Sequence, residues 1–269
     1  MIKATLFDKT GTKKSEINLP SQFNEPVRDD IILRAVLALQ TKRRTIYGAY
    51  LWAGMRYSTR QPKRRREYRG VYGIGISRVP RKIMSRSGTQ FNRVAALAPG
   101  TVGGRKAHAP KSSKIFLERI NNKERVKAIR SAIAASVIKS LVEKRGHKVP
   151  AVYPLVVSKD FENTDKTQAV ISVLSKLGLD NELERSSIKK VRAGKGKLRN
   201  RKYQKKKGLL IVVSGNCKLE ESCKNIPGVD IVNVSSLNAE LLAPGTVPGR
   251  ITLWSEGAIE KLEKDKLFI

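Results

Sequence analysis

Positive charge is concentrated in two segments of this 269-residue chain. Residues 42–111 contain 18 lysines and arginines and one acidic residue, and residues 189–207 contain 11 basic residues and none that are acidic. The rest of the sequence holds 26 basic and 22 acidic residues, so it is nearly neutral. Because segments of such cationic density repel themselves, each needs a polyanion before it can settle into one structure.

Nucleic acid is the commonest partner of this kind, since each neutralised phosphate releases counterions. An anionic membrane is the alternative, but the basic segments lack the apolar stripe of an interfacial helix. No stretch is long and apolar enough for a spanning helix, and the first residues show no secretory signal. The sequence therefore predicts a cytoplasmic protein with a nucleic-acid partner and no membrane partner.

Apolar patterning predicts an α/β body outside the basic segments. Strands are expected at residues 2–7, 151–158, 208–214, 229–234 and 251–255, and helices at 24–44, 121–147, 164–178 and 256–265. Asn24 and Asn121 are expected to cap the first two helices. Because strands and helices alternate, we expect one α/β domain over residues 1–269, a three-layer α/β/α body with a mostly parallel sheet of about four strands.

From about residue 47 to residue 110 the sequence shows no sustained helical or strand period, and its middle is rich in glycine, arginine, serine and proline. A loop this long inside a compact domain is normally functional or disordered. Its apolar content is too high for a merely solvated tail, and ordered elements are expected on both sides of it. We predict an extended irregular loop whose Tyr57, Tyr68, Tyr72 and Phe91 stack on unpaired bases.

Three clustered glycines, Gly70, Gly73 and Gly75, raise the possibility of a dinucleotide loop. The fingerprint G-x-G-x-x-G requires a third glycine where this chain has Arg78, and no buried strand precedes the cluster. A Walker A loop is also absent, because Lys197 is followed by Leu198. The sequence predicts no cofactor, and it predicts that the glycines let the backbone pass close to RNA.

Residues suited to catalysis or metal binding are few. The spacing of Cys217 and Cys223 matches no usual zinc or redox motif, so two ordinary thiols and no metal site are expected. His108 is predicted to contact RNA, and His147 to interact with the carboxyl end of a helix. No nucleophile elbow occurs. The sequence predicts a protein that is not an enzyme.

Two octapeptides resemble each other, APGTVGGR at residues 98–105 and APGTVPGR at residues 243–250. They predict two similar turns, each delivering an arginine.

Two other classes remain open from the residues alone. An RNA-modifying α/β enzyme with a basic arm would need a cofactor loop after its first buried strand, which is not seen. A DNA-compacting protein would migrate with chromatin in a cell lysate.

Six stretches together resemble the L-four family of large-subunit ribosomal proteins (universal uL-four), in its archaeal and eukaryotic branch. They are LPSQFNEPVRDDII, SRVPRK, APGTVGGRKAHAPK, NNKERVKAIRSAIAAS, KKVRAGKGKLRNRKY and LAPGTVPGRITLWSEGAI. The resemblance implies a structural constituent of the large ribosomal subunit, which binds large-subunit rRNA, contacts neighbouring ribosomal proteins and supports assembly. It also implies that the tip of loop 45–111, around residues 70–98, helps form the exit tunnel beside the nascent polypeptide, and that residues 189–207 form a second rRNA-binding segment.

The residues expected to contact rRNA are the cations of both segments, one histidine and the arginine of the second octapeptide. They are Arg60, Lys63, Arg64, Arg65, Arg66, Arg69, Arg78, Arg81, Lys82, Arg86, Arg93, Arg105, Lys106, His108, Lys111, Arg192, Lys195, Lys197, Arg199, Arg201, Lys202 and Arg250. The candidates for the tunnel tip are Gly70, Tyr72, Gly73, Gly75 and Arg78.

Overall fold

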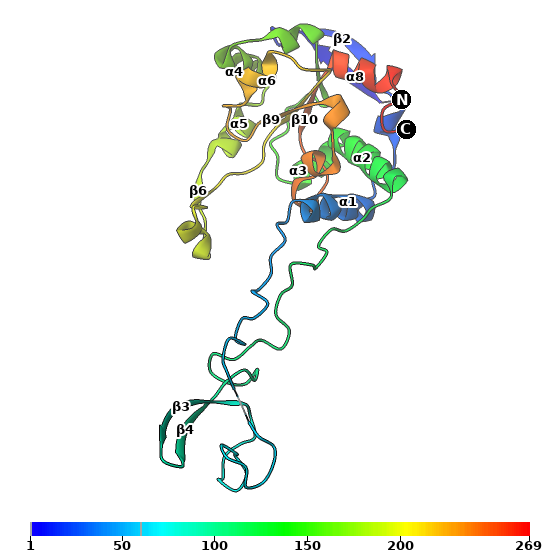
Figure 1. The fold of residues 1–269 in the computed structure, drawn as a ribbon. Helices are drawn as coiled ribbons and strands as arrows, with labels where there is room; N and C mark the ends of the chain where they lie inside the picture. The colour runs from blue at the N-terminus through cyan, green and yellow to red at the C-terminus, as the bar shows by residue number, and fades with distance from the viewer. Residues whose placement is uncertain (1, 60) are drawn as a thin grey trace. The chain divides into compact units, whose positions relative to one another are not determined.

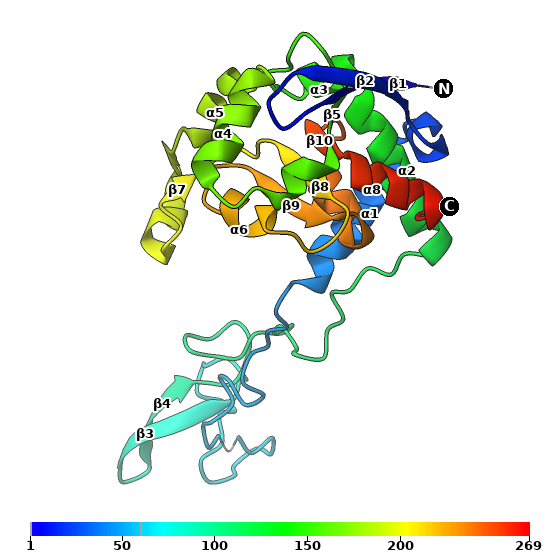
Figure 2. The same ribbon diagram turned by 90° about the horizontal axis from the view of Figure 1, so that it is seen from above.

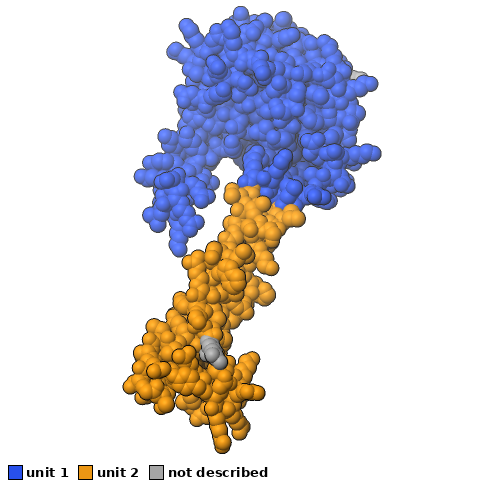
Figure 3. Space-filling model, viewed as in Figure 1, with its two compact units in different colours: residues 1–43, 117–269 blue, residues 44–116 orange. Residues whose placement is uncertain are grey.

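The computed structural model describes residues 2–59 and 61–269. They form two compact units, which Figure 3 colours separately. Unit 1 comprises Met1–Arg43 and Leu117–Ile269, and unit 2 comprises Arg44–Phe116. The bounds of unit 2 lie close to those of the predicted loop 45–111.

Unit 1 contains a six-stranded sheet in the order β2-β1-β5-β10-β8-β9 (Figure 1). Its strands are β1 (Lys3–Phe7), β2 (Lys13–Asn18), β5 (Leu155–Val157), β8 (Leu210–Val213), β9 (Asp230–Asn233) and β10 (Thr252–Ser255). Neighbouring strands are parallel except β1 and β2. The predicted mostly parallel α/β sheet is confirmed, but it has six strands and not about four. The edge strand β2 was missed because its sequence, KKSEIN, is polar and mostly exposed.

The hydrophobic core lies on both faces of this sheet, because neighbouring strand residues point to opposite sides. Val156 and Trp254 belong to one apolar cluster, and Leu155 and Leu253 to the other. The helices α1 (Asp29–Lys42), α2 (Asn122–Val137) and α8 (Glu256–Lys264) contribute to the first cluster. The second includes residues of α4 (Thr167–Lys176) and α6 (Leu219–Cys223), and Figure 2 shows the two helix layers. The predicted three-layer body is confirmed.

The remaining helices of unit 1 are short. They are α3 (Lys139–Lys144), α5 (Asp180–Ser187) and α7 (Ala239–Leu242), with 3₁₀ turns at Ser21–Asn24, Lys159–Asn163, Gly194–Arg199, Val234–Ser236 and Pro244–Thr246. The helix predicted at residues 121–147 is two helices, because Ile138 is extended. The carbonyl of Ser136 accepts the hydroxyl of Tyr153, and this tertiary contact falls where the helix ends.

The first helix begins later than predicted. Asn24 closes a 3₁₀ turn, and α1 starts after Arg28. The preceding segment is fixed by Ser131 of α2, which accepts from the amide of Arg28 at 2.7 Å and donates to the carbonyl of Pro26 at 3.1 Å. Asn121 occupies the cap position of α2 as predicted, but its side chain makes no capping hydrogen bond. The later start of α1 therefore follows from these tertiary contacts with α2.

Two hairpins were not predicted. In unit 2, β3 (Arg81–Ser87) and β4 (Gln90–Ala95) form an antiparallel pair, so the loop is not irregular throughout. Their sequences, RKIMSRS and QFNRVA, show no clean apolar–polar alternation, because arginine and an apolar residue share a face in each strand. In unit 1, β6 (Lys190–Val191) pairs with β7 (Tyr203–Gln204).

Over residues 2–59 and 61–269, no helix meets the length and apolarity that crossing a bilayer would need. Within the same residues, no cluster of His, Cys, Asp and Glu could hold a metal ion. Cys217 and Cys223 are free thiols.

Candidate nucleic-acid interface

The two chain segments that lead into and out of unit 2 lie side by side. The amide of Ala49 donates to the carbonyl of Pro110 at 2.9 Å. The rings of Tyr47 and Phe116 stack with centroids 5.7 Å apart, and the guanidinium of Arg44 lies 4.4 Å from the Phe116 centroid. Backbone and ring contacts therefore join the two segments.

An arginine–aromatic cluster links residues 68–69 to hairpin β3–β4. It is formed by Tyr68, Phe91, Arg69, Arg86 and Arg93. The rings of Tyr68 and Phe91 meet edge to face at 5.4 Å. Arg86 donates to the Tyr68 hydroxyl at 2.9 Å, while Arg69 and Arg93 lie over the two rings at 5.3 and 5.2 Å. A hollow of about 270 Å³ opens beside the rings and is partly lined by the cluster. The cluster thus combines aromatic rings with forked donors, the two kinds of group that contact an unpaired base.

Arg78 and Lys82 lie over aromatic rings in the same unit. The guanidinium of Arg78 is 4.8 Å from the Tyr72 centroid, and the ammonium of Lys82 is 4.0 Å from the Tyr57 centroid. Together with the contacts of the arginine–aromatic cluster, this means that each of the four aromatic residues predicted to stack on bases has a lysine or arginine over its ring. Cation–π contacts hold these rings and charges near the surface, where either can turn to RNA.

The three glycines of the predicted tip serve two different purposes. Gly73 and Gly75 have φ of +78° and +71°, a conformation that side chains disfavour, and the space beside them is open. At Gly70 the limit is steric, because a Cβ would lie 2.8 Å from the carbonyl oxygen of Glu67. The Gly70 carbonyl accepts from Arg93. The glycines therefore shape a tight path in the chain.

Most of the predicted contact residues of unit 2 are exposed. The exposed residues are Lys63, Arg64, Arg65, Arg66, Arg69, Arg78, Arg86, Arg105, Lys106, His108 and Lys111. Arg81, Lys82 and Arg93 are half-buried, and Arg60 lies outside the described residues. Arg81 is held by Ser77, whose hydroxyl accepts from it at 2.8 Å. The structure thus presents a broad cationic surface over most of unit 2.

Unit 2 exposes apolar side chains as well as cations. Leu51, Trp52 and Tyr50 are exposed, the first at 88 %. Among the described residues of unit 2, the only buried hydrophobic side chains are Val71 and Ala96. Tyr50 and Trp52 were not among the predicted contact residues, although the aromatic-rich stretch YGAYLWAGMRY signals them. Exposed apolar surface beside dense charge indicates that a partner covers this unit.

The second basic segment forms a hairpin in unit 1. The amide of Arg192 donates to the carbonyl of Lys202 at 2.8 Å, and its guanidinium donates to the carbonyl of Arg201 at 3.2 Å. A 3₁₀ turn at Gly194–Arg199 joins the strands. The predicted contacts Lys195, Lys197, Arg199, Arg201 and Lys202 are exposed, and Arg192 is half-buried. The hairpin therefore displays these five cations, together with Lys190 of β6, on a defined backbone.

Arg250 does not belong to either cationic surface. It is 0 % exposed and donates to the carbonyls of Gly208, Leu241 and Leu209 at 2.8, 2.9 and 3.3 Å. Its guanidinium also lies 2.5 Å from a carboxylate oxygen of Asp230. The prediction that Arg250 contacts rRNA is wrong, because folding uses all of its donor groups inside the core.

His147 is also buried, and it does not interact with a helix end through its side chain as predicted. Its Nδ1 lies 2.8 Å from Oε1 of Glu182, and Arg185 donates to the same carboxylate at 2.7 Å. Burial lowers the pKa of His147 by more than Glu182 raises it. For Glu182, burial alone would raise the pKa, but the hydrogen bonds from Arg185, His147 and the Lys148 amide hold the pKa at about 2. This buried group stabilises unit 1.

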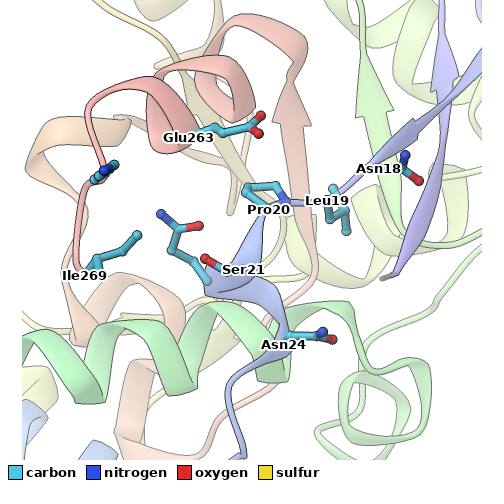
Figure 4. Close-up of a pocket in the computed structure, with 9 residues that line it drawn as sticks. Asn18, Leu19, Pro20, Ser21, Asn24, Glu263 and Ile269 are labelled. Carbon is cyan, nitrogen blue, oxygen red and sulfur yellow. The ribbon is translucent and has the colours of Figure 1, made fainter.

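The stretch LPSQFN, one of those that carry the family resemblance, has a structural explanation. The side-chain amide of Gln22 donates through Nε2 to the backbone carbonyls of Leu262 and Leu267 at 3.0 and 3.2 Å, and these bonds fix the end of α8. Phe23 packs edge to face on Trp254 at 5.0 Å. A pocket of about 460 Å³ lies where this stretch meets the chain end, with Glu263 on its wall (Figure 4). Its lining is mixed and not cationic, so it is separate from the interface.

Comparison with known proteins agrees with this reading of the residues. Residues 17–265 match the model of the Ribosomal protein L4/L1 family. The large ribosomal subunit protein uL4 of Nanoarchaeum equitans is 47 % identical over 268 residues, which cover 99 % of this chain and 100 % of the relative. Those of Methanoregula boonei and Archaeoglobus fulgidus are both 43 % identical, over 97 % of this chain and 99 and 98 % of the relatives. The chain therefore belongs to the Ribosomal protein L4/L1 family.

Proposed function

We propose that this protein is a structural, non-catalytic constituent of the large ribosomal subunit, in which unit 2 and hairpin β6–β7 bind rRNA. The observation that carries the proposal is the composition of unit 2. Its sequence holds 17 lysines and arginines and one acidic residue, and its described part buries two hydrophobic side chains. Such a unit has too little core to offset its own repulsion, so a polyanion must supply the stabilisation.

The proposed contacts divide by chemistry. Exposed lysines and arginines neutralise phosphates and release counterions, which supplies affinity without selecting a sequence. The arginine–aromatic cluster supplies a different contact, because its rings can stack on unpaired bases and its guanidinium groups can bond their edges. Together they would hold rRNA helices close enough to pack, which is the proposed role in subunit assembly.

The location of the tip within the subunit rests on the family resemblance. We place residues 70–98 at the wall of the exit tunnel, beside the nascent polypeptide, with neighbouring ribosomal proteins as further partners. Gly73 and Gly75 support this placement because their positive φ values favour residues without a side chain, which leaves the space beside the backbone open.

Sedimentation of a cell lysate tests the proposal, with the protein tagged outside unit 2. We expect co-migration with large subunits; migration with chromatin would instead support DNA compaction. An RNA-modifying enzyme would bind a nucleotide or methyl-donor cofactor saturably, and we expect no such binding.

A charge reversal tests the contacts of the tip. The double variant Arg78→Glu, Arg81→Glu should reduce the yield of mature large subunits, because two phosphate contacts become repulsive. The matched control is Lys9→Glu, Lys224→Glu, which makes the same charge change on exposed lysines of unit 1. Normal subunit profiles and translation in the tip variant would refute its rRNA contact. A crosslinking map from residues 45–111 would then locate any remaining contact.

A further inference from the structure

A further cationic site lies in unit 1 beyond hairpin β6–β7, and it includes Lys205–Lys207 at the end of the second basic segment. A pocket of about 700 Å³ is formed where the end of α3, helix α5, the segment after β7 and the 244–247 turn meet. Its lining is Lys144, Arg145, Gly146, His147, Arg185, Gln204, Lys205, Lys206, Lys207, Pro244, Gly245 and Val247. Six of these residues are lysine or arginine and none is acidic. The 244–247 turn belongs to the second octapeptide, whose arginine is buried.

Hydrogen bonds fix the walls of this pocket. Arg185 donates to the carbonyl of Lys207 at 2.8 Å, which ties the segment after β7 to α5. Lys207 pairs with Asp230 at 3.0 Å, and Arg145 donates to the carbonyl of Pro244. The pocket is therefore organised before any ligand arrives, which reduces the cost of binding one.

Four of the cations lack a counterion. Glu182 neutralises Arg185. Asp230 pairs with both Lys207 and Arg250. No carboxylate within residues 2–59 and 61–269 pairs with Lys144, Arg145, Lys205 or Lys206. In that same part of the chain, Nη1 of Arg145 is buried without a hydrogen-bond partner. Burial, and then the charges of Arg250 and Arg185, lower the pKa of Arg145 to about 10, so it stays charged at neutral pH. An anion in the pocket would relieve this repulsion.

We propose that this pocket binds a phosphate group of an RNA backbone, with Lys205, Lys206 and Lys144 around it and the charge of Arg145 behind it. RNA is favoured over a free anion because the pocket is continuous with the second basic segment. Lys205–Lys207 follow β7 directly, so a strand bound along the cations of hairpin β6–β7 leads into it. The inference rests on the proposed function, since it assigns one further contact to the same RNA.

The salt dependence of RNA binding tests it on the full chain, with transcribed large-subunit rRNA as the probe. The double variant Lys205→Gln, Lys206→Gln should bind rRNA with a weaker salt dependence. The magnitude of the slope of log K, the logarithm of the association constant, against log salt concentration should fall by about one for each phosphate that the variant no longer neutralises. Lys9→Gln, Lys224→Gln removes the same charge from exposed sites outside the pocket and should leave the slope unchanged. Equal slopes for both variants would overturn the pocket assignment alone. Failure of the wild-type chain to bind the rRNA would overturn the proposed function itself, and this inference with it.

Arg145 allows a second measurement. Because its guanidinium is buried without a counterion, Arg145→Met should leave the Tm of the free protein unchanged or higher, yet weaken rRNA binding. A lower Tm with unchanged rRNA affinity would show a purely structural arginine and contradict the proposal.

Two experiments identify the kind of ligand: photocrosslinking from the pocket wall and binding of inorganic phosphate. A photoreactive benzoylphenylalanine in place of Val247, on the pocket wall, should crosslink to RNA in assembled particles. Crosslinks to protein alone would overturn the assignment to RNA. Saturable binding of inorganic phosphate that rRNA does not displace would assign the pocket to a free anion and would equally overturn it.

Discussion

Arg105 and Arg250 end octapeptides that differ only in Gly103 against Pro248, yet their surroundings are opposite. Arg105 is exposed in unit 2, whereas Arg250 is fully buried and bonded to three carbonyls and Asp230. An arginine in water keeps its charge for a partner. One that folding has desolvated must satisfy its donors internally, and it then acts as a structural crosslink.

Replacing each arginine by leucine should separate the two roles. Arg250→Leu leaves Asp230 half-buried with Lys207 as its remaining partner, so we expect a loss of about 3 kcal/mol in the free energy of unfolding. Arg105→Leu should change it by less than about 0.5 kcal/mol, because the site is exposed. Urea unfolding, followed by Trp254 fluorescence in a Trp52→Phe background, measures both. A smaller loss for Arg250 than for Arg105 would contradict this assignment.

The lowered pKa of Glu182 predicts how the free energy of unfolding of unit 1 changes at low pH. Its folded-state pKa of about 2 lies below the ordinary value of 4.5, so its contribution is complete above about pH 4.5. The contribution is lost as the pH falls through about 2, and it amounts to about 3 kcal/mol. Unfolding measured from pH 6 to pH 2 should show this slope in the wild type and a flatter one in Glu182→Gln. Parallel pH profiles for the two proteins would refute the role of Glu182.

At the scale of elements, hairpin β3–β4 and helix α1 differ in what stabilises them. Helix α1 buries Ile32 and Val36 in the apolar cluster that it shares with α2 and α7. Hairpin β3–β4 has no buried residue in either strand, and the arginine–aromatic cluster is its main side-chain support. A two-stranded hairpin without a packed face is marginally stable in water.

Hydrogen exchange should show that difference. In the free protein, amides of residues 60–100 should exchange with an opening free energy near zero, while those of β8 and β10 approach the global value. Binding of rRNA should protect residues 60–100, because the loop orders on its partner. Strong protection across residues 60–100 without RNA would overturn the prediction.

At the scale of the whole molecule, the two units divide the work. Unit 1 carries a complete core on both faces of its sheet, with strongly buried residues such as Trp254 and Leu155. Unit 2 carries 17 basic residues and one acidic residue, which is half of the chain's net charge of +32, and it has almost no core. Stability therefore comes from unit 1, and affinity for a polyanion comes mainly from unit 2.

Replacing residues 45–115 by a flexible glycine–serine linker tests this division. Since unit 2 adds little buried apolar surface, the Tm of unit 1 should change by no more than a few degrees, about 1 kcal/mol. The affinity for rRNA should fall and its salt slope should become shallower, because most of the cations that neutralise phosphates are removed. Thermal unfolding and filter binding at several salt concentrations measure the two effects. An unfolded deletion variant, or one with unchanged salt slope, would contradict the division.

The sequence by itself determined the classes of structure and partner. Apolar runs such as LIVV at β8 predict buried parallel strands, and dense cations around Arg64 predict a polyanion, because hydrophobic burial and charge repulsion are properties of local composition. The polar strand β2, the break at Ile138 and the hairpin β3–β4 were missed. The strands β2, β3 and β4 carry too many exposed polar and charged residues to show a strand pattern, and the break at Ile138 falls where Ser136 contacts Tyr153.

Only the tertiary structure decided which cations are available. Arg250 and Arg105 stand in nearly the same local sequence, and Arg145 looks like any surface arginine at a helix end. Folding buried Arg250 among carbonyls and left Arg145 without a counterion beside Lys205 and Lys206. Desolvation and pairing are set by neighbours in space, so no local pattern could predict them.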